Sequence, residues 1–163
     1  MIYPFGTIIT SKQGDNEMVQ VLRVELKFSI LDKDFKKSWD SCNAGPYTGR
    51  YRVDHIGGYP FLKLQTSMEY QPEPEEDGMS HIPYGKVFGF KDIEQFTRWF
   101  SDDMAWLDWS GFVLAVYEVP ESSIIYGRSQ LAFSLKEATL VEYFDSCRRV
   151  WKDHYRSKRR IAA

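Results

Sequence analysis

The sequence predicts an α+β fold, with a single compact domain, a mainly antiparallel sheet that is either continuous or split, and two or three helices. Segments with alternating apolar residues indicate strands, helical periodicity recurs in the second half, and turn residues link neighbouring strands. The length of 163 residues and the hydrophobic content of 43% suit one domain with a sizeable core. We therefore treat residues 1–163 as one domain.

The first 20 residues are expected to form an N-terminal strand and hairpin. "MIYPFGTIIT" is the first strand, and "SKQGDN" supplies the turn. In "VQVLRVELKFSI", apolar residues from Leu22 to Ile30 alternate with Arg23, Glu25 and Lys27. This period of two predicts a strand with one buried face.

The middle of the chain is rich in turn signals. Residues 32–41 are expected to form a short helix, and "CNAGPYTGRY" at 42–51 forms a glycine- and proline-containing corner. Residues 49–70 are predicted to form two strands broken at Gly57 and Gly58. "QPEPEEDGMSHIPYG" at 71–85 is predicted to be a surface loop, and such loops often carry binding groups.

The second half changes period. Residues 90–111 are predicted to form an amphipathic helix that Gly111 ends, because Ile93, Phe96 and Phe100 recur at helical spacing. "FVLAVYEV" at 112–119 is apolar on both faces, which predicts a central strand. Short strands are expected at 122–127 and 129–133, a helix at 134–155, and a frayed basic tail at 156–163.

Charge and cysteine content limit the class of protein. A net charge of −2 and a pI near 5.9 argue against a surface devoted entirely to nucleic acid or membrane. Two distant cysteines indicate neither a disulfide framework nor a zinc site, and the three histidines lack metal-ligand spacing, so no metal is expected. Without a secretory signal or a membrane-length apolar run, we expect a soluble cytoplasmic protein with no membrane partner.

Two oppositely charged segments stand out from the near-neutral total. One is acidic and contains Glu69, Glu73, Glu75, Glu76 and Asp77; the other is the basic end of the chain from Arg148 to Arg160. Either segment is a partner-binding surface or an ordinary solvated one.

Six motifs in order carry a family resemblance: "VLRVEL", "GPYTG", "PEPEEDG", "FGFKDIEQFTRWF", "GFVLAVYEVP" and "SQLAFSLKEATLVE". Together they resemble a group of small uncharacterised bacteriophage proteins, over Val21 to Glu142. The chain departs from the family pattern where Leu22 replaces a tyrosine and Gln71 replaces a histidine. The resemblance implies a protein of the host-cell cytoplasm.

The layout is also weakly similar to ADP-ribosyltransferase folds, in which a split sheet grips NAD. This resemblance implies that Arg23 holds phosphates and that Glu118 or Gln130 supplies the late catalytic group. It also implies ligand contacts by Tyr47, Thr66 and Ser67. Gln130 lacks the glutamate that normally follows two residues later, since Ala132 stands there. NAD is a cofactor only under this interpretation.

Structural roles compete with these chemical ones. Arg23 could be an exposed strand residue paired with Glu25 or with a cross-strand acid. Tyr47 could pack beneath its own turn, and Trp99, Trp106 and Trp109 suit a core at helical spacing.

Two functional hypotheses follow. The favoured one is an accessory protein that binds and inhibits or redirects a host macromolecular complex involved in defence, nucleic-acid cleavage or polymerisation. Its partner contacts are Glu75, Glu76 and Asp77, whose carboxylates could mimic phosphates. The alternative is an ADP-ribosyltransferase-like enzyme or a binder of an NAD-derived nucleotide. A third possibility is that the basic C-terminal tail contacts nucleic acid.

Overall fold

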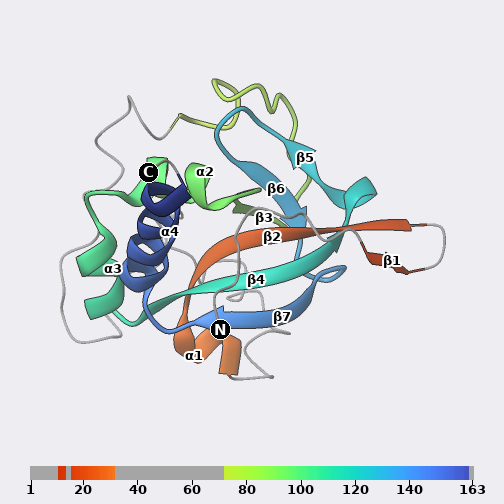
Figure 1. Cartoon of the computed structure of the whole chain (residues 1–163). Helices are drawn as coiled ribbons and strands as arrows, with labels where there is room; N and C mark the ends of the chain where they lie inside the picture. The colour runs from red at the N-terminus through yellow and green to blue at the C-terminus, as the bar shows by residue number, and fades with distance from the viewer. Residues whose placement is uncertain (1–10, 14–15, 32–71, 162–163) are drawn as a thin grey trace.

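The computed structural model describes residues 11–13, 16–31 and 72–161, and these residues confirm the α+β class. The expected strand at 1–10, the helix at 32–41, the corner at 42–51 and the strands at 49–70 lie outside them. Figure 1 shows the order of the elements along the chain.

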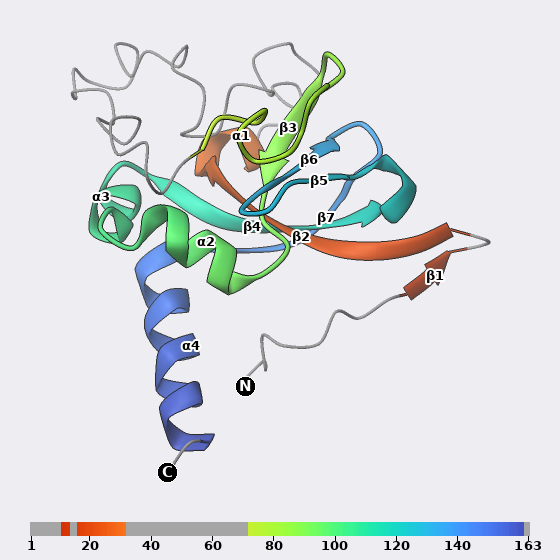
Figure 2. The same ribbon diagram turned by 90° about the horizontal axis from the view of Figure 1, so that it is seen from above.

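Two antiparallel sheets form the framework, so the sheet is split. The first has the strand order β1-β2-β4-β7 and the second β3-β6-β5. Figure 2 shows the second sheet lying against the first. The strands are β1 Ser11–Gln13, β2 Asn16–Leu26, β3 Lys86–Gly89, β4 Phe112–Pro120, β5 Ile125–Tyr126, β6 Leu131–Ser134 and β7 Thr139–Phe144.

The long β2–β4 pair is the centre of the fold. It runs in register from Met18 opposite Pro120 to Leu26 opposite Phe112, and β7 pairs with the other edge of β4. Strand β4 is buried on both faces, which confirms the predicted central strand. The prediction of one buried face for β2 was wrong, because the second sheet covers the face that carries Arg23 and Glu25.

Strand β2 also ends earlier than its pattern predicts. The pairing with β4 stops at Leu26, and Lys27–Leu31 forms the short helix α1 instead of continuing the strand. The amide of Lys27 donates to the carbonyl of Gly111 at 3.0 Å, just before β4 begins. Since β4 begins at Phe112, no described strand continues past Leu26 to pair with a longer β2, and the chain turns into a helix.

A core between the two sheets includes Val21, Val113, Ala115, Leu131 and Phe133. Strand β3 comes close to β2 at its end, where Leu22 and Phe90 exchange two backbone hydrogen bonds of 2.8 and 2.7 Å. Gly89 permits this approach, since a Cβ there would lie 2.7 Å from the carbonyl oxygen of Leu22.

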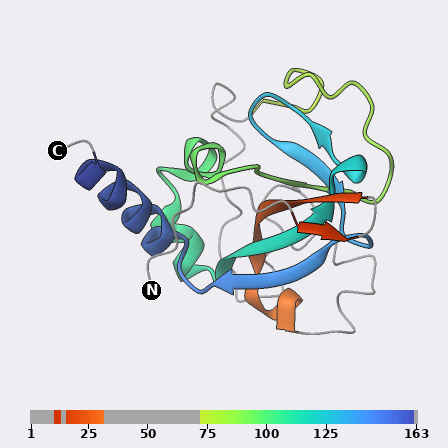
Figure 3. The ribbon, with the colours of Figure 1, turned by 45° about the vertical axis from the view of Figure 1, so that its right-hand side comes forward.

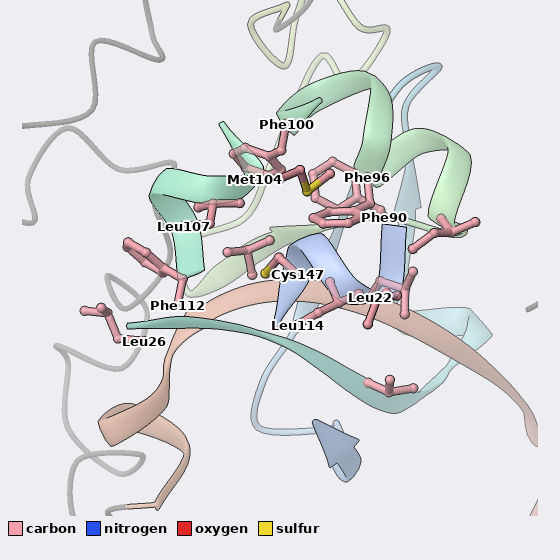
Figure 4. Close-up of a cluster of buried hydrophobic side chains, with 14 residues drawn as sticks. Leu22, Leu26, Phe90, Phe96, Phe100, Met104, Leu107, Phe112, Leu114 and Cys147 are labelled. Atoms are coloured by element: carbon pink, nitrogen blue, oxygen red, sulfur yellow. The ribbon is translucent and has the colours of Figure 1, made fainter. Parts of the chain in front are cut away.

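Helices cover the opposite face of the first sheet. They are α2 Ile93–Phe100, α3 Met104–Trp109 and α4 Cys147–Ile161. Beneath them lies a second core rich in aromatic rings, shown in Figure 4. The ring of Phe90 is central to it, with centroids 5.9–6.2 Å from Phe96, Trp99 and Phe100. Trp99 and Trp106 pack against this core, whereas Trp109 is exposed.

The predicted helix at 90–111 divides into α2 and α3. Asp92 caps the start of α2 by accepting from the amide of Gln95 at 2.8 Å, and a turn at 101–103 separates the two helices. The polar run of Ser101, Asp102 and Asp103 favours this interruption, because such side chains compete for backbone hydrogen bonds. Gly111, with φ +81°, follows α3 as predicted.

The predicted helix at 134–155 was wrong over its first half. Residues 139–144 form β7, and α4 begins only at Cys147. The segment "TLVEYF" is rich in β-branched and aromatic residues, and it pairs with the edge of β4 that β2 leaves free. Helix α4 continues to Ile161, so residues 156–161, expected to fray, are helical.

Helix α4 is fixed to the domain at its start and midway along its length. At its start, the hydroxyl of Ser146 donates to Asp108 at 2.6 Å and accepts from the amide of Arg149 at 3.0 Å. Further along, the Nε2 atom of the buried His154 lies 3.1 Å from a carboxylate oxygen of Glu94 on α2. Figures 2 and 3 show α4 projecting away from the sheets. Within the described ranges, the helices are too short or too polar to cross a membrane.

Candidate functional site

Arg23, the leading catalytic candidate, lies between the two sheets. It occupies the middle of β2 and is 1% exposed. Its Nε donates to Glu25 at 2.6 Å, and its Nη1 donates to the carbonyl of Phe88 on β3 at 2.5 Å. The guanidinium therefore joins the second sheet to the first.

Glu25 and Tyr117 complete this buried network. Glu25 is 3% exposed, and its second carboxylate oxygen accepts from the hydroxyl of Tyr117 on β4 at 2.8 Å. Burial and the neighbouring Glu25 carboxylate both raise the pKa of Tyr117 above its usual value. Arg23 and Glu25 therefore form a hydrogen-bonded ion pair. This is the pairing that the structural alternative for Arg23 predicts, except that the pair is buried and not exposed.

The other two catalytic candidates do not join Arg23. Glu118 is half-buried on β4, between Tyr117 and Val119, whose side chains face the core between the sheets. Because side chains alternate along a strand, Glu118 lies on the opposite face of the sheet from Arg23. Gln130 precedes β6, where its side-chain amide donates to the carbonyl of Pro72 at 3.1 Å.

The three ligand-binding candidates, Tyr47, Thr66 and Ser67, lie outside the described residues. Whether Tyr47 reaches a ligand or packs under its turn stays a prediction.

Asp77, a candidate for partner contact, anchors the acidic loop. It is 2% exposed, and its carboxylate accepts from the amide and hydroxyl of Ser129 at 2.9 and 2.8 Å. It also accepts from the amide of Gln130 at 3.1 Å. Gly127 makes room for this carboxylate, since a Cβ there would overlap it. The side chain that the sequence placed on the surface is thus turned inward.

The remaining acidic residues of the loop face outward. Glu73, Glu75 and Glu76 are exposed, on a turn closed by hydrogen bonds such as that from the Asp77 amide to the Glu73 carbonyl, at 2.9 Å. The side chain of Arg128 donates to the carbonyl of Glu76 from the neighbouring turn. The structure therefore brings Asp77 and Gln130 together, as parts of a support that presents Glu75 and Glu76.

Several of these supporting residues were not predicted from the sequence. Ser129 and Arg128 sit next to the predicted Gly127 turn, and that turn was a usable signal for a docking point. Tyr117 carried no such signal, since it lies in an apolar strand like any core aromatic. The partner of Ser129 is Asp77, 52 positions away, and the partner of Tyr117 is Glu25, 92 positions away. The local sequence does not indicate partners at such distances.

A basic groove beside α4 was also not foreseen. Its volume is about 530 Å³. It is lined by Asp108, Ser146, Arg148, Arg149, Lys152, Asp153 and Arg156. The sequence predicts a nucleic-acid contact in the tail at 156–163, whereas this groove runs along the first turns of the helix.

Among the described residues, Cys147 is a free cysteine and is buried. Burial raises the pKa of the Cys147 thiol to about 12, so it stays protonated at neutral pH. No cluster of three or more potential metal ligands occurs among the described residues.

A family model described as Bacteriophage T4 Y00F protein matches residues 18–146. The match covers well over half of the 163-residue chain. The chain belongs to this phage protein family. The Y00F match confirms the resemblance to phage proteins, and its range includes both sheets from β2 onward and the acidic loop, ending just before α4. No curated protein and no solved structure matched, and the similarity to ADP-ribosyltransferases gains no support.

Proposed function

We propose that this phage protein is an accessory protein that binds a host macromolecular complex and inhibits or redirects it. The observation that carries the proposal is the acidic loop, whose exposed Glu75 and Glu76 stand on a turn fixed by the buried Asp77. Ordering a loop before binding reduces the entropy that binding must overcome. A fixed pair of carboxylates is therefore better suited to recognition than a mobile acidic segment.

The partner surface that fits this loop is basic. Exposed carboxylates can occupy cationic positions that otherwise contact nucleic-acid phosphates, as in a nuclease, a polymerase or a defence complex. Occupying such a surface would exclude the natural substrate without any chemistry. The NAD-binding alternative has less support, because Arg23 is buried and already bonded to Glu25 and Phe88.

The test compares two charge-reversal variants in a pull-down from host lysate. Glu75→Lys with Glu76→Lys changes the loop, and Glu137→Lys with Glu142→Lys makes the same charge change at exposed positions elsewhere. We expect the wild-type protein and the control to retain a stoichiometric partner that the loop variant loses. Recovery of no partner, or equal retention by both variants, would contradict the proposed surface.

A further inference from the structure

We propose that α4 binds duplex DNA through the phosphate backbones of both strands. This inference goes beyond the proposed function, because it concerns a different surface and a different class of partner. The surface, called the basic face, consists of Arg148, Arg149, Lys152, Arg156, Arg159 and Arg160, all exposed.

The basic face lies opposite the side of α4 that packs on the domain. Cys147, Val150 and His154 are buried. At about 100° per residue, the six cations fall within an arc of about 120° on the other side of the helix. Lys158 is on the buried side, where it pairs with Glu94. The exposed cations are therefore gathered on one outward surface.

These cations are largely free to meet an external anion. Asp153 is the acidic residue within α4, and it lies 3.8 Å from Arg149 and 3.9 Å from Arg156 in exposed, weak pairs. Within the described residues, Arg148, Lys152, Arg159 and Arg160 have no carboxylate within ion-pair distance. The start of the helix is already capped by Ser146 and Asp108, so the attraction comes from side chains.

The charge is concentrated on α4. The helix holds seven Lys and Arg residues and one Asp, a net charge of +6, while the whole chain has −2. The rest of the chain therefore has a net charge of −8. The difference in net charge between this body and the projecting helix directs a polyanion toward the helix.

The arrangement of the cations favours a duplex over a single strand. Arg148, Lys152 and Arg159 form one row along the helix, and Arg149, Arg156 and Arg160 form a second row about 80° around it. A helix is about 10–12 Å across with its side chains, and the major groove of B-DNA is about 12 Å wide. Two rows on one helix can therefore contact the two backbones that border the groove.

The experiment measures fluorescence anisotropy of a labelled duplex of about 20 base pairs, with the full-length protein, between about 50 and 200 mM salt. We expect the logarithm of the association constant to fall against the logarithm of salt with a slope of about −4 to −5, since each phosphate contact contributes about −0.9. No binding at the lowest salt would overturn the proposal.

Two matched variants locate the contact. Arg148→Glu with Lys152→Glu is expected to weaken binding at least about tenfold and to reduce the slope by about 2. Arg98→Glu with Lys136→Glu makes the same charge change at exposed positions outside α4 and should weaken binding less than about twofold. If both pairs weaken binding equally, general charge and not the basic face is responsible. Arg148→Gln with Lys152→Gln gives a second, milder test if the reversal disturbs folding.

Competing ligands decide the partner class. A single strand of the same length, and vesicles of phosphatidylglycerol with phosphatidylcholine, are measured beside the duplex. The proposal requires the duplex to bind most tightly. Equal or tighter binding of the single strand or the vesicles would overturn it. Host-partner capture by the acidic loop is measured separately, so either proposal can fail without the other.

Discussion

At the scale of single residues, Arg23 illustrates how a charge can be structural. Its guanidinium spans from Glu25 on its own strand to the carbonyl of Phe88 on the other sheet. Such a buried pair contributes little net stability compared with an apolar pair, but the loss of one partner is costly, because the other charge stays buried. Arg23 and Glu25 should therefore be sensitive to replacement separately and less so together.

We predict that Glu25→Gln lowers the free energy of unfolding by about 3–5 kcal/mol, since it leaves the Arg23 cation without a counter-ion. The double variant Arg23→Met with Glu25→Gln should lose less than Glu25→Gln alone, because it removes both charges and the new side-chain amide still accepts from the hydroxyl of Tyr117. Urea denaturation of the wild type and both variants measures this difference. A cost below about 1 kcal/mol for Glu25→Gln would show that the pair is not buried in solution.

The candidate residues also show the limit of sequence patterns at this scale. Alternation correctly placed Arg23 and Glu25 on the same face of β2. It did not reveal that a second sheet covers that face, because a period of two looks the same whether the polar side meets water or an internal ion pair. Asp77 was misplaced on the surface for a related reason: its partners, Ser129 and Gln130, come from a turn more than 50 positions along the chain.

At the scale of elements, the long central strands β2 and β4 were predicted from their apolar patterns, whereas β3 and β7 were not predicted as strands. The apolar run of β4 needed burial on both faces, which the second sheet supplies on one face and the helices on the other. The helix prediction for 134–155 rested on Phe144, Cys147, Trp151 and Tyr155, which can share one helical face, and only Phe144 of these lies in β7. Its strand conformation depends on the free edge of β4, which is a tertiary property.

The contact between α2 and α4 gives a prediction for pH. Burial of Glu94 would raise its pKa, but the hydrogen bond from Lys158 and the nearby His154 outweigh burial and lower it. A carboxylate with a lowered pKa in the folded state stabilises that state above its unfolded pKa, and this contribution is lost as pH falls through the folded value. The stabilisation is therefore complete at neutral pH and is lost progressively below about 4.5.

We accordingly expect Glu94→Gln to lower the melting temperature by about 1–3 °C at pH 7, a small effect because Glu94 is partly exposed. The difference from the wild type should shrink between about pH 4.5 and 3 as the wild-type carboxylate becomes protonated. Thermal unfolding followed by circular dichroism at several pH values measures this. If the difference in melting temperature stays constant over that pH range, the charge of Glu94 does not stabilise the packing of α4.

At the scale of the whole molecule, charge is divided between two surfaces. The ribbon views place the acidic loop near β5 and β6, and α4 projects from another side of the domain (Figure 3). Exposed charges farther apart than a Debye length of about 8–10 Å are largely screened at physiological salt. The two surfaces should therefore act independently at that salt concentration and influence one another only at low salt.

Because the two surfaces are separate, we predict that a variant of either one loses its own binding activity and keeps the other. Glu75→Lys with Glu76→Lys should abolish capture of the host partner while leaving duplex binding within about twofold at about 150 mM salt, and tightening it at about 20 mM salt as the acidic body loses charge. Arg148→Glu with Lys152→Glu should weaken duplex binding and leave partner capture intact. Anisotropy and pull-down with the same four proteins, including the wild type and the combined variant, measure both activities. Loss of both activities in either double variant would mean that the loop and α4 contribute to one shared surface, because screening at this salt excludes a long-range effect between separate ones.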